Sequence, residues 1–194
     1  MNTKTWKLND IILTAMICIV FGVIYLGAVY LIGIVDGLFA FTGLSKLGTE
    51  LIFGVWLMAA TFAGYVIQKP GVAIVAEVIA AVIEVLLGNW FGPMVIVAGI
   101  IQGLGAEIVF AAFKYRRFQG KVMYLAAIGS CITSFLWSFV RSGYLQFSIG
   151  VLVIYFLIRL VSSLLFAGLI CKKVGDGMAK TGLLKSYGLG RNSQ

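Results

Sequence analysis

Six long apolar stretches dominate the sequence and constrain its fold more than any other feature. Apolar residues make up 61% of the 194 positions, about 118, and six membrane-spanning helices of about 20 residues need about 120. Charged residues account for only 11%, against about 25% in a soluble domain. We therefore predict an all-α integral membrane protein, with six transmembrane helices within residues 1–173 and a tail at 174–194. The predicted spans are 11–34, 48–67, 71–88, 93–113, 122–140 and 146–170.

The basic residues predict the orientation of these helices in the membrane. Six spans place both termini on one side. Only Lys46 and Arg141 fall in the opposite loops and Arg159 lies within the last span, which leaves 12 of the 15 basic residues on the side of the termini, among them Lys4, Arg116 and Arg117. The positive-inside rule then predicts that both termini are cytoplasmic. Because topology accounts for the net charge of +8, we do not expect nucleic acid as a partner.

Residue types that are absent or scattered limit the chemistry. The chain has no histidine, which excludes Ser-His and Cys-His catalysis and His-ligated zinc or haem, and it has no GxxxxGK[ST] motif for ATP. Asp10, Asp36 and Asp176 lie too far apart for a paired-aspartate metal site. The three cysteines lie in or at the end of apolar runs and suit buried packing. We expect neither an enzyme nor a bound cofactor or metal.

Small residues recur every four positions and mark faces where helices approach closely. For the last of the three stripes we expect packing inside the bundle rather than against another subunit. The stripes are Thr14, Cys18 and Gly22; Gly99 and Gly103; and Ala126, Ser130, Ser134, Ser138 and Ser142.

Two segments outside the spans have a predicted character. The exterior connection at 35–47 contains aromatic residues and single charges, which suit a lid that packs back onto the protein or an ordinary interfacial loop. The tail from residue 174 has few large apolar residues, so we expect it to be cytoplasmic and poorly ordered.

Ionisable residues inside the membrane are costly, so they indicate pairing or function. Glu77, Glu107 and Arg159 fall at a similar inner depth of the predicted spans. We expect this inner layer to be structural, with Arg159 neutralising Glu107 or Glu77.

A second layer lies nearer the exterior surface. Glu84 shares a helix face with Glu77 and lies only about 6 Å below the exterior end of its predicted span. Carboxylates among aromatic rings suit an organic cation. Alternatively, the tryptophans belong to an interfacial belt, Glu84 pairs with Arg141, and Gln102 only binds a neighbouring helix. The candidate binding residues are Glu84, Glu50, Trp56, Asn89, Trp90, Gln102 and Trp137.

Three segments carry a resemblance to a known family. They are ELIFGVWLMAATFAGYVIQKPG from Glu50, VAEVIAAVIEVLLGNWFGP from Val75 and IIQGLGAEIVFAAFKYRR from Ile100. Together with the six spans, they resemble the YkoE-type S components of energy-coupling factor (ECF) transporters. The resemblance implies a substrate-binding membrane subunit for thiamine or its hydroxymethylpyrimidine precursor, working with a membrane T component and two cytoplasmic ATPases.

The resemblance also implies roles for particular residues. Glu84, with Glu50 as a second candidate, would meet the thiazolium of thiamine. Asn89 and Gln102 would bond its aminopyrimidine, and Trp56, Trp90 and Trp137 would stack on its rings. The family's helix-one A-x-x-x-A contact for the T component is broken here, since Ile19 follows Ala15. The docking face is therefore either that of Ala15 or that of the Thr14, Cys18 and Gly22 stripe.

Two other classes of function remain open from the sequence. A stand-alone secondary transporter or channel for a small cation would use the inner layer for ion coupling. An intramembrane enzyme is disfavoured by the absence of histidine and of paired aspartates. The choice between thiamine and the free pyrimidine also stays open.

Overall fold

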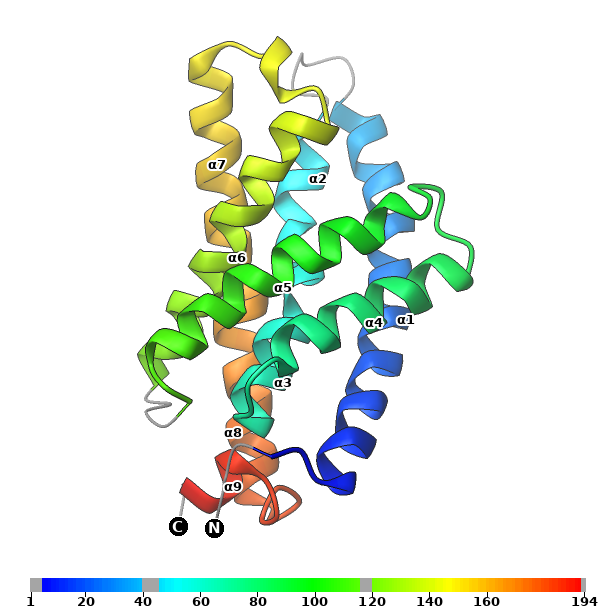
Figure 1. The fold of residues 1–194 in the computed structure, drawn as a ribbon. Coiled ribbons are helices and arrows are strands. Elements are labelled where there is room, and N and C mark those ends of the chain that lie inside the picture. The colour runs from blue at the N-terminus through cyan, green and yellow to red at the C-terminus, as the bar shows by residue number, and fades with distance from the viewer. Residues whose placement is uncertain (1–4, 40–45, 116–119, 193–194) are drawn as a thin grey trace.

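The computed structural model describes residues 5–39, 46–115 and 120–192, and in this part of the chain every regular element is a helix (Figure 1). The elements are α1 (Leu8–Phe39), α2 (Leu47–Ile52), the 3-10 helix η2 (Phe53–Leu57), α3 (Met58–Ile67), α4 (Val72–Leu86), α5 (Met94–Ala112), α6 (Gly120–Arg141), the 3-10 helix η3 (Tyr144–Gln146), α7 (Ile149–Ser163), the π-helix η4 (Leu164–Ile170), α8 (Cys171–Lys180) and α9 (Gly188–Asn192).

Five helical stretches of the described chain are long and apolar enough to cross a membrane: Leu8–Phe39, Leu47–Ile67, Met94–Ala112, Lys121–Arg141 and Ile149–Lys180. The third predicted span is the exception. It forms α4, whose 15 residues extend about 22 Å, less than the roughly 30 Å of the hydrocarbon core. This helix runs obliquely between α1 and α5 (Figure 1). The all-helical class is confirmed, whereas the sixth crossing stays a prediction.

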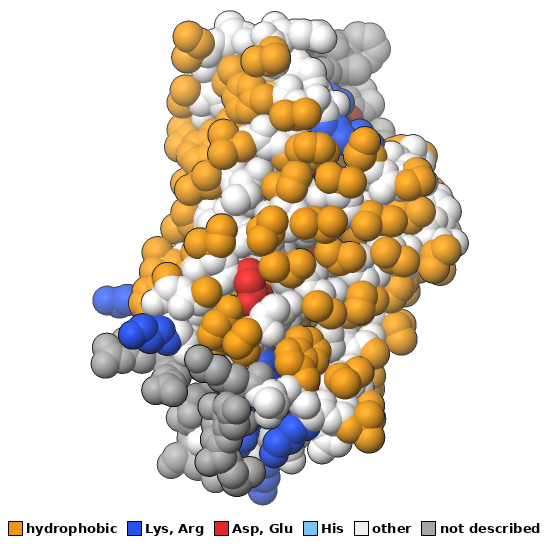
Figure 2. Space-filling model, viewed as in Figure 1, with side chains coloured by type: hydrophobic (Ala, Val, Ile, Leu, Met, Phe, Trp, Pro, Cys, Tyr) orange, Lys and Arg blue, Asp and Glu red, His pale blue; other side chains and the backbone are white. Residues whose placement is uncertain are grey.

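The first and last described helices meet at one end of the bundle (Figure 1). Hydrophobic side chains cover the middle of the face in Figure 2, and most of the visible Lys and Arg side chains lie toward that end. Lys4, Arg116 and Arg117, which contributed to the predicted topology, lie outside the described residues. The orientation of this end toward the cytoplasm stays a prediction.

The predicted exterior loop at 35–47 is partly helical. Residues 35–39 continue α1 to Phe39, and α2 begins at Leu47, while residues 40–45 lie outside the described chain. Asp36 joins the two helices, because its carboxylate accepts hydrogen bonds from the Thr49 hydroxyl at 2.7 Å and the Thr49 backbone N–H at 3.1 Å. Asp36 therefore ties the end of α1 to the start of α2, and the choice between a lid and an interfacial loop at 40–45 concerns residues outside the described chain.

The second span is interrupted in its middle. The chain passes from α2 through η2 to α3, and at this point Gly54 packs so closely on the backbone of Ser162 that a side chain at Gly54 would collide with it. The Ser162 hydroxyl accepts a bond from the Gly54 N–H at 2.9 Å and donates one to the Leu51 carbonyl at 2.7 Å. The last span changes to the π-helix η4 directly after this contact, so the two irregular segments support each other.

The three stripes of small residues pack inside the bundle along most of their length, although Ser142, beyond the end of α6, is exposed. Gly103 lies against the backbone of α4 at Ile74, and the Cys18 thiol donates to the Ala76 carbonyl of α4 at 3.5 Å. On α6, the Ser130 hydroxyl donates to the Gln102 carbonyl of α5 at 2.8 Å. Internal packing of the α6 stripe is thus confirmed. The stripe of Thr14, Cys18 and Gly22 is covered by α4 and cannot be the docking face, whereas Ala15 and Ile19 are exposed.

The expectation of a poorly ordered tail is wrong for the described residues. The last span continues through α8 to Lys180, and Leu184 and Leu189 join the main hydrophobic core. Tyr65 of α3 donates a hydrogen bond to the Asp176 carboxylate at 2.6 Å, which ties α8 to the second span. A few apolar contacts and one strong hydrogen bond thus order a segment with few large apolar residues.

Candidate ligand-binding cavity

A cavity of about 130 Å³ lies at the end of the bundle opposite the described termini. Its wall comes from α1, the start of span two, α4, α5 and α6, and its outer rim includes Arg141 at the last residue of α6. Four of the seven predicted binding residues line it, namely Trp56, Glu84, Gln102 and Trp137. Residues from distant parts of the sequence therefore meet at one polar and aromatic site.

Glu84 is fully buried, and only one of its two carboxylate oxygens has hydrogen-bond partners among the described residues. Its Oε1 accepts hydrogen bonds from the Asn89 amide at 2.9 Å and from the Trp56 indole at 3.4 Å. Its Oε2 is buried and has no hydrogen-bond partner among the described residues. Since an unsatisfied buried carboxylate oxygen is costly, this atom is suited to accept a bond from a ligand.

Trp137, on the wall formed by α6, has a hydrogen-bond donor that is unpartnered in the described part of the chain, whereas Glu84 has an unpartnered acceptor. Its indole Nε1 is buried and has no acceptor among the described residues. Ser134 and Ser138 from the stripe of small residues line the cavity beside it. The outer half of that stripe therefore makes room for the cavity, while its inner half packs on α5.

Asn89 and Trp90 lie in the turn between α4 and α5, outside the cavity lining. Gly88 and Gly92 form this turn at φ values of 101° and 74°, which residues with a side chain rarely adopt. Besides donating to Glu84, the Asn89 side chain accepts a bond from the Phe91 N–H, so both ends of its amide are used within the protein. Trp90 is 54% exposed and meets Tyr30 of α1 edge-on. The turn instead contributes the Phe91 ring to the cavity.

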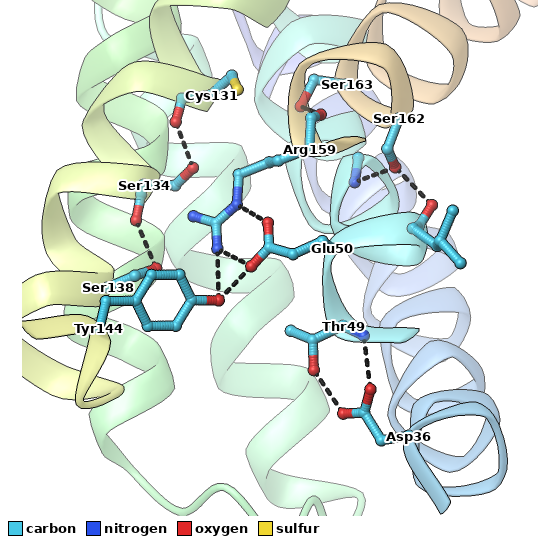
Figure 3. Close-up of polar contacts among 12 residues, drawn as sticks. Asp36, Thr49, Glu50, Cys131, Ser134, Ser138, Tyr144, Arg159, Ser162 and Ser163 are labelled. Carbon is cyan, nitrogen blue, oxygen red and sulfur yellow. Dashed lines mark hydrogen bonds and ion pairs between the residues drawn. The ribbon is translucent and has the colours of Figure 1, made fainter. Parts of the chain in front are cut away.

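Glu50, the second candidate counter-ion, lies in a buried network rather than in the cavity lining. Figure 3 shows its carboxylate bound by Arg159, whose Nε and Nη2 each donate a hydrogen bond to it at 2.6 Å. Tyr144 of η3 also donates to Glu50. Burial and the Glu50 carboxylate raise the pKa of Tyr144 well above its usual range, so the hydroxyl stays protonated and able to donate. The Arg159 guanidinium stacks on Phe53, 3.7 Å from the ring centroid, and Phe53 lines the cavity.

The predicted pairing of Arg159 with Glu107 or Glu77 is therefore wrong. The prediction placed the start of the last span at residue 146, but α7 begins at Ile149 and its helix continues to Lys180. Arg159 is consequently only about 15 Å below the outer end of its helix, at the level of Glu50.

Glu77 and Glu107 instead bind the N-terminal N–H groups of other helices. Glu77 accepts from the Ala60 N–H of α3 at 2.7 Å and from the Tyr25 hydroxyl at 2.9 Å. Glu107 accepts from the N–H groups of Gly71 and Ala73 at 2.5 and 3.0 Å, at the start of α4. A helix N-terminus carries unsatisfied N–H groups and a partial positive charge, so a buried carboxylate is stabilised there. The two carboxylates thus cap helices instead of pairing with Arg159, and Glu77 also lines the cavity. A structural role for this layer stays a prediction.

The lining also contains residues that were not among the predicted binding residues, among them Tyr25, Phe53, Glu77, Phe91 and Arg141. Tyr25 continues the buried stripe of α1 one turn beyond Gly22, so helical spacing contained a signal for it. Arg141 was noted as an exterior charge. No comparable signal distinguishes Phe53 and Phe91 from the other phenylalanines, because their positions depend on the span-two interruption and on the turn at 87–93.

Comparisons with known proteins agree with this architecture. The family described as "ABC-type cobalt transport system, permease component" matches residues 9–133. HMP/thiamine permease protein YkoE of Bacillus subtilis (strain 168) is 44% identical over 188 residues, covering 97% of this chain and 92% of that protein. A crystal structure of an S component of an ECF transporter superposes with a TM-score of 0.91 at 43% identity, covering 97% of this chain and 93% of that one.

The fold and the cavity thus define a substrate-binding membrane subunit of an ABC-type importer. The chain belongs to the YkoE-type S components of ECF transporters. The expected family is confirmed.

Proposed function

We propose that this S component binds the aminopyrimidine group shared by hydroxymethylpyrimidine and thiamine, takes it up from the exterior and delivers it to the cytoplasm. The relative from Bacillus subtilis is named for both compounds. Because both compounds contain the same aminopyrimidine ring, a site that recognises this ring can bind either compound. What is attached to the ring then modulates affinity.

The observation that carries the proposal is a pair of polar atoms without partners among the described residues, Glu84 Oε2 and Trp137 Nε1, on two residues that line the same cavity. An aminopyrimidine has an amino group that donates to a carboxylate oxygen and a ring nitrogen that accepts from an indole N–H. The two atoms are therefore complementary to the ring in both polarity and number. Gln102 lines the same cavity and offers an amide to a second ring nitrogen.

The size and lining of the cavity support the same ligand. Its volume of about 130 Å³ is on the scale of the roughly 150 Å³ that accommodates a single six-membered ring. The rings of Trp56, Phe53 and Phe91 surround it, and flat heteroaromatic ligands pack well against such rings. We therefore place the pyrimidine inside and its 5-substituent toward the mouth.

Substitution Glu84→Gln tests the proposal and distinguishes two roles for the carboxylate. If Glu84 accepts from the amino group, the affinity for hydroxymethylpyrimidine and for thiamine falls by a similar factor, about ten- to a hundredfold. If Glu84 is instead the counter-ion of the thiazolium, only thiamine binding weakens. Isothermal titration of the purified protein with both ligands measures the two factors.

Two matched tryptophan variants provide the control. Trp137→Phe removes the indole N–H from the cavity, whereas Trp90→Phe removes one from the exposed turn. We expect Trp137→Phe to weaken the binding of both ligands by about tenfold and Trp90→Phe to leave it unchanged. Equal effects of the two variants, or no binding of either ligand to the wild type, would contradict the proposed site.

The proposed partners are a membrane T component and two cytoplasmic ATPases. The outer face of α1 around Ala15 and Ile19 is exposed and free of other helices, so it is the proposed docking face. Substitution Ala15→Trp should abolish co-purification with the T component while ligand affinity stays unchanged. Intact co-purification would move the docking face to another helix.

A further inference from the structure

The mouth of the cavity carries a positive charge that the proposed function does not use. Arg141 is the sole cation among the described residues that line the cavity, and it is exposed at the outer end of α6. The ion pairs within the described chain join Asp10 to Lys69, Glu50 to Arg159 and Lys172 to Asp176. None of them neutralises Arg141.

The guanidinium of Arg141 is held in place but keeps donors available. Its Nη2 donates to the carbonyl of Phe91 at 2.8 Å, which fixes it beside the ring that covers the cavity. A guanidinium has five N–H donors in a planar fork that matches phosphate oxygens. The neighbouring residues Ser138 and Ser142 also line the cavity, so hydroxyl groups lie on the same side of the mouth.

The size of the cavity determines which part of a ligand Arg141 meets. A single ring fills about 130 Å³, so the substituent on the pyrimidine methylene extends to the mouth. A phosphate there gains charge-assisted hydrogen bonds, a hydroxyl is neutral toward Arg141, and a cationic group is repelled.

We infer that Arg141 forms a phosphate-binding subsite at the mouth, so that the protein binds the phosphate monoester of hydroxymethylpyrimidine at least as tightly as the free alcohol. The inference rests on the proposed function, because the pyrimidine must occupy the cavity for its substituent to reach Arg141. It adds phosphorylated pyrimidines to the substrate class of the site.

The decisive measurement is the ratio of the Kd of the alcohol to the Kd of its phosphate monoester, in the wild type, Arg141→Gln and Arg141→Lys. Glutamine keeps an amide donor for the Phe91 carbonyl but has no charge, so we expect the ratio to fall by about tenfold or more, because the Kd of the phosphate ester rises far more than that of the alcohol. Lysine keeps the charge and should preserve part of the ratio. Lys46→Gln, which removes a charge outside the cavity lining, should leave the ratio at the wild-type value.

The possible outcomes separate this inference from the proposed function. Wild-type protein that binds the alcohol but binds its ester ten times more weakly, or a ratio unaffected by Arg141→Gln, overturns the phosphate subsite alone. Failure to bind any aminopyrimidine overturns the proposed function and the subsite with it. An equal loss of ratio in Lys46→Gln shows a diffuse charge effect and also overturns the subsite.

Discussion

Two carboxylates on one face of α4, seven residues apart, have opposite relations to their surroundings. Glu77, at the interruption of span two, is fully buried, and both of its oxygens accept hydrogen bonds from the protein. Glu84, nearer the outer end, is equally buried, but its Oε2 is left without a partner among the described residues. Residue type, burial and helix face are the same, so the two carboxylates differ in whether donors of the protein satisfy both of their oxygens.

The two carboxylates differ because the second span is interrupted beside Glu77 but not beside Glu84. At its interruption the Ala60 N–H near the start of α3 donates to Glu77. The neighbouring Ala59 N–H donates to the Tyr25 hydroxyl, which in turn donates to Glu77. Farther out, Glu84 faces side chains of Trp56 and Asn89 and a cavity in place of a helix terminus. The N-terminus created by this interruption thus helps to satisfy Glu77, whereas Glu84 keeps one oxygen without a partner among the described residues.

The largest expected effect concerns Glu50, the third buried carboxylate, whose bonding is also complete. Arg159→Leu removes its counter-ion and leaves a buried charge, so the free energy of unfolding should fall by about 3–5 kcal/mol. Thermal or denaturant unfolding in detergent measures the loss. The double variant Glu50→Leu with Arg159→Leu removes both charges and should be more stable than the single variant. If the free energy of unfolding lost in the double variant equalled the sum of the losses in the two single variants, the Glu50–Arg159 pair would have no energetic coupling.

A smaller effect directly compares the two carboxylates of α4. In Glu77→Gln one carboxylate oxygen becomes an NH2 group, a donor that faces the donors around this site, and the remaining bonds lose their charge assistance. We expect a loss of about 1–3 kcal/mol in the free energy of unfolding. Glu84→Gln should lose less than about 1 kcal/mol and weaken ligand binding instead. Equal stability losses in the two variants would remove the distinction between them.

Much of this architecture follows from the sequence. Apolar run length and the small-residue stripes predict the helical class and the packing faces, because both depend on local composition and on the helical repeat. Of the seven candidate residues, Glu50, Asn89 and Trp90 lie outside the cavity lining, whereas Trp56, Glu84, Gln102 and Trp137 meet in one cavity. Depth along a span and a shared helix face were sufficient for these four.

The partners of the charges could not be predicted in the same way. Arg159 was assigned to the wrong carboxylate because its depth depends on where α7 begins, and a shift of three residues moves a side chain by about 4.5 Å. The capping role of Glu77 depends on a helix N-terminus that no residue in the sequence marks, since η2 consists of the ordinary apolar stretch FGVWL. The start of α4 was predicted, but its contact with Glu107 of α5 depends on how the two helices pack. Helix breaks inside apolar runs are set by tertiary contacts such as that of Gly54 with Ser162.

The smallest expected effect tests how Glu84 is held. Trp56 and Asn89 both donate to Oε1, but the indole contact is 3.4 Å long, against 2.9 Å for the amide. Because hydrogen bonds weaken as they lengthen, Trp56→Phe should reduce ligand affinity by no more than about threefold, and the ring contact with the ligand is retained. Asn89→Ala removes the shorter bond and also releases the Phe91 N–H, so it should have the larger effect. If Trp56→Phe weakened hydroxymethylpyrimidine binding more than Asn89→Ala does, the indole rather than the amide would orient Glu84. Both carboxylates of α4 would then be held mainly by span two, Glu84 by Trp56 and Glu77 by Ala60.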